Sequence, residues 1–236
     1  MATKKKYIEP EYGPAPRDLT DHPFYGIPLD ADQKLFAEAI LNPEKLIIFC
    51  DAPAGTGKTT VSMAAASLLV QHHEYDGIVG IVSPCNEGRQ GFLPGDITAK
   101  SEVYFEPFYQ AMIECNMNPA SDVCKEALVN QNGDDEPVTL ITDTFLRGSN
   151  FHKRVVIIDE AQNFTASNLK KTLTRIADDC KVVCIGHRGQ NDLDVREQSG
   201  FEQYIEHFRA DPRTAVCELH TNHRGWISSH ADALQF

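Results

Sequence analysis

The sequence is poor in positive charge. Its 22 lysines and arginines are outnumbered by 34 aspartates and glutamates, which gives a formal net charge of −12 over 236 residues. This total argues against a protein coated with basic surface for duplex nucleic acid, although it leaves room for a local basic channel. No apolar run approaches the length that spans a membrane. The opening MATKKKYIEP has no apolar core behind its charges, so we expect no secretory signal.

Paired cysteine motifs are also missing. The seven cysteines are scattered and form no Cys-x-x-Cys pair, which argues against a zinc site and against a disulfide framework. Cys50, Cys184 and Cys217 lie inside apolar, strand-like runs, where a reduced cysteine behaves as a small hydrophobe. This usage predicts a protein of the reducing cytoplasm.

Apolar runs alternate with helical stretches through most of the chain. Residues 1–28 differ, because their prolines and weak periodicity predict an extended N-terminal arm. Residues 29–41 have helical spacing, and further helices are expected at about 58–73, 101–116, 120–130, 166–178, 200–209 and 226–235. The runs interpreted as strands are KLIIFCDA, GIVGIVSP, VTLITDTF, RVVIIDEA, KVVCIGH and TAVCELH. Since strands that are apolar throughout are covered on both faces, we predict that residues 29–236 form one α/β domain, a three-layer fold with a mainly parallel central sheet.

The stretch CDAPAGTGKTT, residues 50–60, connects an apolar strand to an alanine-rich helix. In a phosphate-binding loop (P-loop), backbone N–H groups wrap the phosphates and the helix N-terminus adds a positive dipole end. Lys58 is expected to reach the β- and γ-phosphates, and the Thr59 hydroxyl to ligate Mg²⁺. The residues predicted to contact the nucleotide are Pro53, Ala54, Gly55, Thr56, Gly57, Lys58, Thr59 and Thr60. The alternative is a glycine-rich turn that carries a lysine by chance.

One position departs from the P-loop pattern. Ala52 stands where the first glycine is expected. A methyl group is tolerable there if the backbone stays extended, and Pro53 favours an extended conformation for the residue before it. We therefore expect the loop to bind phosphate in spite of Ala52.

The run RVVIIDEAQNFT supplies the acidic partner of a P-loop. Four apolar residues end at Asp159 and Glu160. In P-loop ATPases such an aspartate holds the Mg²⁺ shell and a following glutamate can polarise the attacking water. The alternative is a solvated acidic pair at a strand end. Together with the loop, these residues predict a P-loop ATPase of RecA-like fold that uses ATP and Mg²⁺.

Several motifs in this order resemble the PhoH-like proteins. They are DAPAGTGKTT, GFLPGDITAK, FLRGSNF, VVIIDEAQNFT, LTRIADDCKVV and SGFEQYI, and they cover roughly residues 29–230. These relatives are phosphate-starvation-associated ATPases of bacteria and their phages, with a core similar to superfamily 1 helicases. The resemblance implies a helicase-like ATPase acting on single-stranded RNA or DNA in the cytoplasm of a bacterial cell or a phage-infected host. It also implies a hexamer.

The resemblance assigns further residues. Gln33 matches a glutamine that reads the adenine edge, and Gln190 matches a glutamine that senses the γ-phosphate. The family usually has Gly-Asp where this chain has Gly186-His187. Three arginines match candidates for the charge-stabilising arginine, namely Arg147, Arg175 and Arg224, of which Arg224 is favoured because it stands where the family places its late arginine.

The length predicts how the site is completed. A superfamily 1 helicase closes ATP between two similar domains, whereas about 208 residues form only one here. We therefore expect a ring or filament in which each subunit offers an arginine to its neighbour's nucleotide. Two other functions stay open: an ATP-switched assembly protein without a nucleic-acid substrate, and a small-molecule phosphotransferase on a P-loop scaffold. No intrinsic ribonuclease and no membrane association are expected.

Overall fold

The computed structural model describes residues 13–84, 97–124, 136–146, 150–190, 193 and 198–232. Within these ranges the chain forms a six-stranded sheet in the order β3-β2-β4-β5-β1-β6, and every strand pair is parallel. The strands are β1 (Ile47–Asp51), β2 (Gly77–Val82), β3 (Val138–Thr142), β4 (Arg154–Ile158), β5 (Lys181–Gly186) and β6 (Thr214–Glu218). Each of the six apolar runs contains one strand, so the predicted fold class is confirmed.

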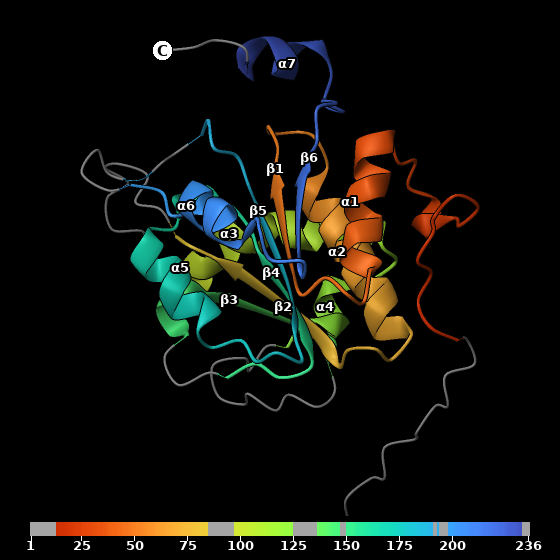
Figure 1. Cartoon of the computed structure of the whole chain (residues 1–236), viewed down its shortest axis with the longest axis horizontal. Coiled ribbons are helices and arrows are strands. Elements are labelled where there is room, and N and C mark those ends of the chain that lie inside the picture. Colours follow the sequence, from red (N-terminus) through yellow and green to blue (C-terminus); the bar gives the residue numbers. More distant parts are fainter. Residues whose placement is uncertain are drawn as a thin grey trace, which may run out of the picture.

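Helices cover both faces of the sheet (Figure 1). The helices are α1 (Ala31–Leu41), α2 (Lys58–Gln71), α3 (Ile97–Glu114), α4 (Pro119–Asp122), α5 (Ala166–Leu173), α6 (Phe201–Phe208) and α7 (Trp226–Asp232), with short 3-10 turns η1 (Phe24–Gly26), η2 (Asp143–Phe145) and η3 (Ala161–Asn163). Figure 1 shows α1 and α2 on one side of the sheet and α5 and α6 on the other. Among the described residues, no helix is both long and apolar enough to cross a bilayer.

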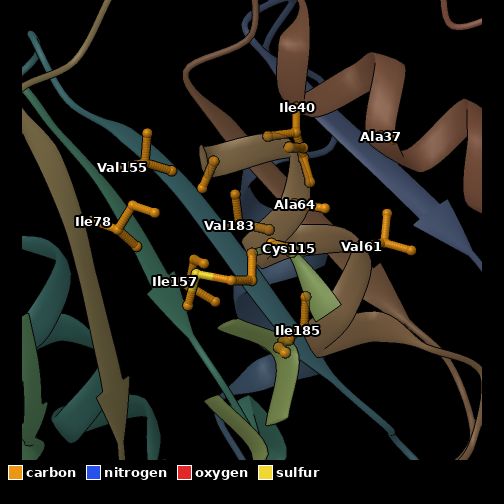
Figure 2. Close-up of a cluster of buried hydrophobic side chains, with 14 of the residues drawn as sticks. Ala37, Ile40, Val61, Ala64, Ile78, Cys115, Val155, Ile157, Val183 and Ile185 are labelled. Carbon is orange, nitrogen blue, oxygen red and sulfur yellow. The ribbon is translucent and has the colours of Figure 1, made fainter. Parts of the chain in front are cut away.

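Alternate residues of each strand supply the two halves of the core. In β1, Ile48 and Cys50 belong to the cluster under α1 and α2, whereas Ile47 and Phe49 belong to the cluster under α5 and α6. Figure 2 shows the first cluster, which combines strand residues such as Ile157 and Val183 with helix residues such as Ala64 of α2. This two-sided burial explains why the strands are apolar throughout.

Two expectations differ from the structure in detail. The helix expected at 120–130 starts at Pro119 but ends at Asp122, and Val123 instead forms a parallel bridge with Val138. Residues 125–130 lie outside the described part of the chain. The helix expected at 166–178 ends at Leu173, because the chain turns there toward β5 and Phe151 bridges Ile176.

The described part of the N-terminal arm packs on the domain. Ala15, Leu19 and Phe24 are buried in the same core cluster as α1 and α2. The Arg17 guanidinium forms an ion pair of 2.7 Å with Glu74 at the end of α2. The division at residue 28 stays a prediction, but residues 13–28 contribute to the core rather than extending away from it.

Candidate nucleotide-binding site

The predicted site residues meet at one edge of the sheet. Because all strands are parallel, their carboxyl ends lie together. The P-loop follows β1, Asp159 and Glu160 follow β4, and residues 187–190 follow β5. Since β5 lies between β1 and β4, its loop stands between the phosphate loop and the acidic pair.

The P-loop has the conformation that phosphate binding requires. Gly55 and Gly57 have φ values of 80° and 81°, in the left-handed region that glycine adopts without strain. Gly57 caps α2 without a side-chain hydrogen bond, so the first N–H groups of this helix are available to an anion. Ala52 has no positive φ, and its N–H donates to the Gly186 carbonyl at 2.9 Å. Alanine at position 52, where the P-loop pattern has its first glycine, is therefore compatible with the conformation of the loop.

Lys58 is held by the loop itself. Its Nζ donates to the carbonyl oxygens of Ala52, at 2.7 Å, and Pro53, at 2.9 Å. The hydroxyl of the buried Thr56 also donates to Pro53, at 2.9 Å. Among the described residues, both hydrogen-bond partners of this ammonium group are neutral carbonyls, which it can exchange for phosphate oxygens that form stronger charge-assisted hydrogen bonds.

Gln33 braces the P-loop from α1. Its Nε2 donates to the Thr56 carbonyl at 2.9 Å, while its Oε1 accepts the Asp30 N–H at 3.1 Å in the capping box of α1. A Cβ on Gly57 would lie 2.8 Å from Gln33 Nε2. One N–H and one lone pair of the amide remain for a base edge, so the adenine role stays a prediction beside this bracing role.

Thr59 and Asp159 lie together as a magnesium site would require. The Thr59 hydroxyl donates to Asp159 Oδ2 at 2.9 Å. Burial and the adjacent Glu160 raise the pKa of Asp159 to about 6. A divalent cation at this point would offset both causes, because it replaces lost solvation and neutralises charge. A hydroxyl and a carboxylate are hard oxygen ligands, so these residues fit Mg²⁺.

Glu160 is exposed and strained. Its φ of 49° lies in the left-handed region, which is uncommon for a residue with a side chain and typical of functional sites. Its carboxylate accepts a short hydrogen bond from Nε2 of the buried Gln162. Oε1 of Gln162 accepts the His187 N–H at 3.0 Å. Gln162 thus connects the predicted general base to the loop after β5.

That loop is fastened to β1 by Asp51. Asp51 accepts hydrogen bonds from the backbone N–H of Arg188, at 3.0 Å, and from its Nε. The same guanidinium lies 3.3 Å from Glu218 and 3.7 Å from Glu202. The hydrogen bond with Asp51 raises the pKa of Arg188 above its usual value. Gln190 follows on this loop, exposed, and its N–H donates to His187 at 3.1 Å; its sensor role stays a prediction.

The three candidate arginines have different positions. Arg224 lies in the segment after β6, against the P-loop of its own chain. Arg175 lies at the opposite edge of the sheet, where its carbonyl accepts the Phe151 N–H three residues before β4 begins. Arg147 lies outside the described residues, as do residues 91–96 of the GFLPGD motif. Of the two described candidates for the charge-stabilising arginine, the structure brings only Arg224 to the nucleotide edge.

Several site residues were not identified from the sequence. Asp51, Gln162, Arg188 and Asn222 all connect segments that are distant in the chain. Asp51 and Gln162 stand inside the two recognised motifs, but their partners depend on the strand order. The sequence patterns carry no signal for that order.

Comparisons with known proteins agree with this geometry. The family model described as PhoH-like protein matches residues 27–224. Protein PhoH of Escherichia coli (strain K12) is 32% identical over 174 residues, covering 73% of this chain and 47% of that protein. A PhoH-like protein of Mycobacterium leprae is 31% identical over 181 residues, covering 76% and 49%. The chain thus spans about half the length of these curated relatives.

A solved structure shares the fold at low identity. The UvsW helicase from bacteriophage T4 has a TM-score of 0.52 and 14% identity, covering 81% of this chain and 60% of that one. At this identity the likeness concerns the fold alone. The family match over most of the sequence, the P-loop and the acidic pair at one sheet edge together identify a P-loop nucleotide-binding domain, and the chain belongs to the PhoH-like protein family.

Proposed function

We propose that this protein is a Mg²⁺-dependent ATPase that acts on, or is stimulated by, single-stranded RNA or DNA. The observation that carries the hydrolytic part is the pairing of Thr59 with Asp159 at 2.9 Å beside an exposed Glu160. A nucleotide-binding protein without hydrolysis needs no carboxylate held in a strained conformation at this point.

Each residue has a distinct task in the proposed reaction. Lys58 leaves the carbonyls of Ala52 and Pro53 and neutralises charge on the β- and γ-phosphates. Thr59 and Asp159 hold Mg²⁺, which supplies charge neutralisation and orients the phosphates when it is bound. Glu160 accepts a proton from the attacking water. Gln190 contacts the γ-phosphate, and Gln33 the adenine.

The nucleic-acid part rests on the DEAQN motif and on the helicase-like core that the family resemblance implies. The fold shared with a phage protein described as a helicase is the fold that this proposal requires. We keep the homo-oligomer, with a hexamer favoured, as a proposal. Glu160, Gln190 and Arg224 are exposed, so another copy has room to cover the site.

A second candidate is an ATP-switched assembly protein without a nucleic-acid substrate. The net charge of −12 favours it, because anionic strands are repelled by an acidic surface. Trp226 and Ile227, which are 71% and 79% exposed near the nucleotide edge, also suit a protein contact.

The test is phosphate release from ATP with Mg²⁺, with and without single-stranded RNA or DNA. Glu160→Gln should lower the rate at least about 100-fold, the usual size of a general-base contribution, and leave ADP binding intact. Glu102→Gln, the same change on the exposed surface of α3, should leave the rate unchanged. Stimulation by a strand should weaken with added salt. Hydrolysis that is not stimulated by single-stranded RNA or DNA supports the assembly protein. Absence of hydrolysis contradicts the proposal.

A further inference from the structure

The segment after β6 is fixed to the P-loop of its own chain. We call residues 220–232 the C-terminal strap; Figure 1 shows its helix α7 beyond the ends of β1 and β6. Asn222 Nδ2 donates to the Ala54 carbonyl at 3.1 Å, and the His223 N–H donates to the Gly55 carbonyl at 2.8 Å. Asn222 Oδ1 accepts the N–H of Arg224 at 2.8 Å. The phosphate loop thus holds Asn222 and His223 directly, and Asn222 positions the backbone of Arg224.

The strap is also attached to the N-terminus of α1. His223 Nε2 lies 3.0 Å from Asp30 Oδ2, and His220 Nδ1 lies 2.9 Å from Asp32 Oδ2. Asp30 is the residue that caps α1, the helix from which Gln33 braces the P-loop. These contacts fix the part of the strap that immediately precedes Arg224 to both α1 and the P-loop.

The side chain of Arg224 runs along the P-loop. A Cβ on Gly55 would lie 3.0 Å from both Cγ and Cδ of Arg224, so these methylene groups lie directly over the glycine. The guanidinium carbon is two bonds beyond Cδ. It therefore starts from the loop that binds the phosphates, within reach of an anion held there.

Arg224 differs from Arg188, which lies at the same edge of the sheet, in having no carboxylate partner among the described residues. Arg188 contacts the carboxylates of Asp51, Glu202 and Glu218. No carboxylate of the described residues forms an ion pair with the exposed Arg224. Of these two cations, only Arg224 can receive a phosphate without breaking an ion pair.

We infer that Arg224 acts on the nucleotide bound to its own P-loop, so that each subunit supplies its charge-stabilising arginine in cis. This inference rests on the proposed ATPase function. It differs from the ring mechanism expected from the sequence, in which a neighbour donates the arginine. A neighbouring copy then has a structural task, such as covering the site, and donates no catalytic arginine.

Mixed assemblies separate the two mechanisms. Arg224→Ala should lower phosphate release at least about 100-fold. Chains carrying Arg224→Ala are co-expressed with differently tagged chains carrying Glu160→Gln, and assemblies that contain both are purified. If the arginine acts in cis, every chain lacks either Arg224 or Glu160, so the mixture stays as inactive as each variant. With the arginine in trans, about a quarter of the sites regain both groups, so recovery to about that level overturns the inference.

One control variant tests whether the loss is specific to Arg224. Arg209→Ala removes an exposed arginine that pairs with Glu206 on α6, and it should leave the rate unchanged. Wild-type rates in Arg224→Ala would also overturn the inference. If the protein is a monomer, loss of activity in Arg224→Ala supports action in cis directly.

A binding measurement decides the matter without hydrolysis. Trp226 is the single tryptophan of the chain and stands two residues after Arg224, so its fluorescence reports nucleotide at the strap. At dilutions where copies separate, Arg224→Ala should weaken ATP binding about tenfold and ADP binding far less. Equal losses, or none, contradict a contact with the γ-phosphate in cis. Inactive wild-type protein with this ATP-selective loss would contradict the ATPase proposal and retain the arginine contact.

Discussion

Gln162 joins two groups that come from different strands. Its Nε2 donates to Glu160, which follows β4, and its Oε1 accepts the His187 N–H, which follows β5. A Cβ on Gly186 would lie 2.6 Å from Gln162 Oε1, so the glycine makes room for this amide. At the scale of single residues, the predicted general base Glu160 is therefore positioned by a neutral hydrogen-bond donor.

Gln162→Glu tests this positioning role. The new carboxylate cannot donate to Glu160 and repels it, so kcat should fall about 10- to 100-fold while the affinity for ADP stays the same. Steady-state kinetics and ADP titration measure the two quantities. Gln203→Glu makes the same change on the exposed surface of α6 and should leave both unchanged. If the affinity for ADP fell by the same factor as kcat, Gln162 would instead support the nucleotide-binding site as a whole.

At the scale of elements, the strap and α1 enclose the P-loop between them. α1 contributes Gln33, and the strap contributes Asn222, whose Nδ2 also donates to Ser228 Oγ in α7 at 2.9 Å. α7 is thereby linked to the phosphate loop through one side chain. We therefore predict that a displacement of the Ala54 carbonyl would be transmitted to α7 through Asn222.

Asn222→Ala should release the strap from the loop. The change removes the bonds to Ala54, Ser228 and Arg224, so we expect faster proteolysis after β6 and a smaller fluorescence response of Trp226 to ADP. The thermal midpoint should change little, because the strap buries few apolar side chains. Ser229→Ala removes only the hydroxyl that donates to the Gly225 carbonyl, just before α7, and serves as the control. An unchanged response to ADP would show that α7 does not depend on Asn222.

The sequence predicted the elements better than their contacts. Apolar runs located all six strands, since two-sided burial leaves a local signal, and the motifs located Lys58, Thr59 and Asp159. The premature end of α4 depends on the pairing of Val123 with Val138, which is a long-range contact. The ion pair of Arg188 with Asp51 depends on β5 lying next to β1. Such features follow from strand order, which local periodicity does not encode.

At the scale of the whole molecule, the buried ammonium group of Lys181 connects the start of β5 to the segment between α1 and β1. Lys181 at the start of β5 is 1% exposed, and its Nζ donates to the carbonyls of Asn42, at 2.6 Å, and Lys45, at 2.8 Å. Burial, together with the charge of Arg17, lowers the pKa of Lys181 to about 8. The unfolded chain keeps this lysine protonated up to about pH 10.4.

Stability should therefore depend on pH through Lys181. Between about pH 8 and pH 10 the unfolded state binds a proton that the folded state has lost, so this group increases stability as the pH rises, by about 2–3 kcal/mol in all. Below pH 8 the cost of the buried charge is fully present. Urea unfolding of the wild type and Lys181→Met at several pH values measures the difference, in which shared cysteine and tyrosine titrations cancel. If the free energies of unfolding of the wild type and of Lys181→Met change with pH in the same way, a lowered pKa at Lys181 is contradicted.

The position of β1 also determines when the nucleotide site forms during synthesis. Ile47 is in register with Val182 of β5 and with Thr214 of β6, which leave the ribosome 135 and 167 positions later. Until then the apolar strand that carries the P-loop has neither neighbour, and unpaired strands of this kind promote aggregation. We therefore expect a nascent chain to gain little stabilisation from nucleotide until both β5 and β6 have been synthesised, because only then does the strand that carries the P-loop have its two neighbours.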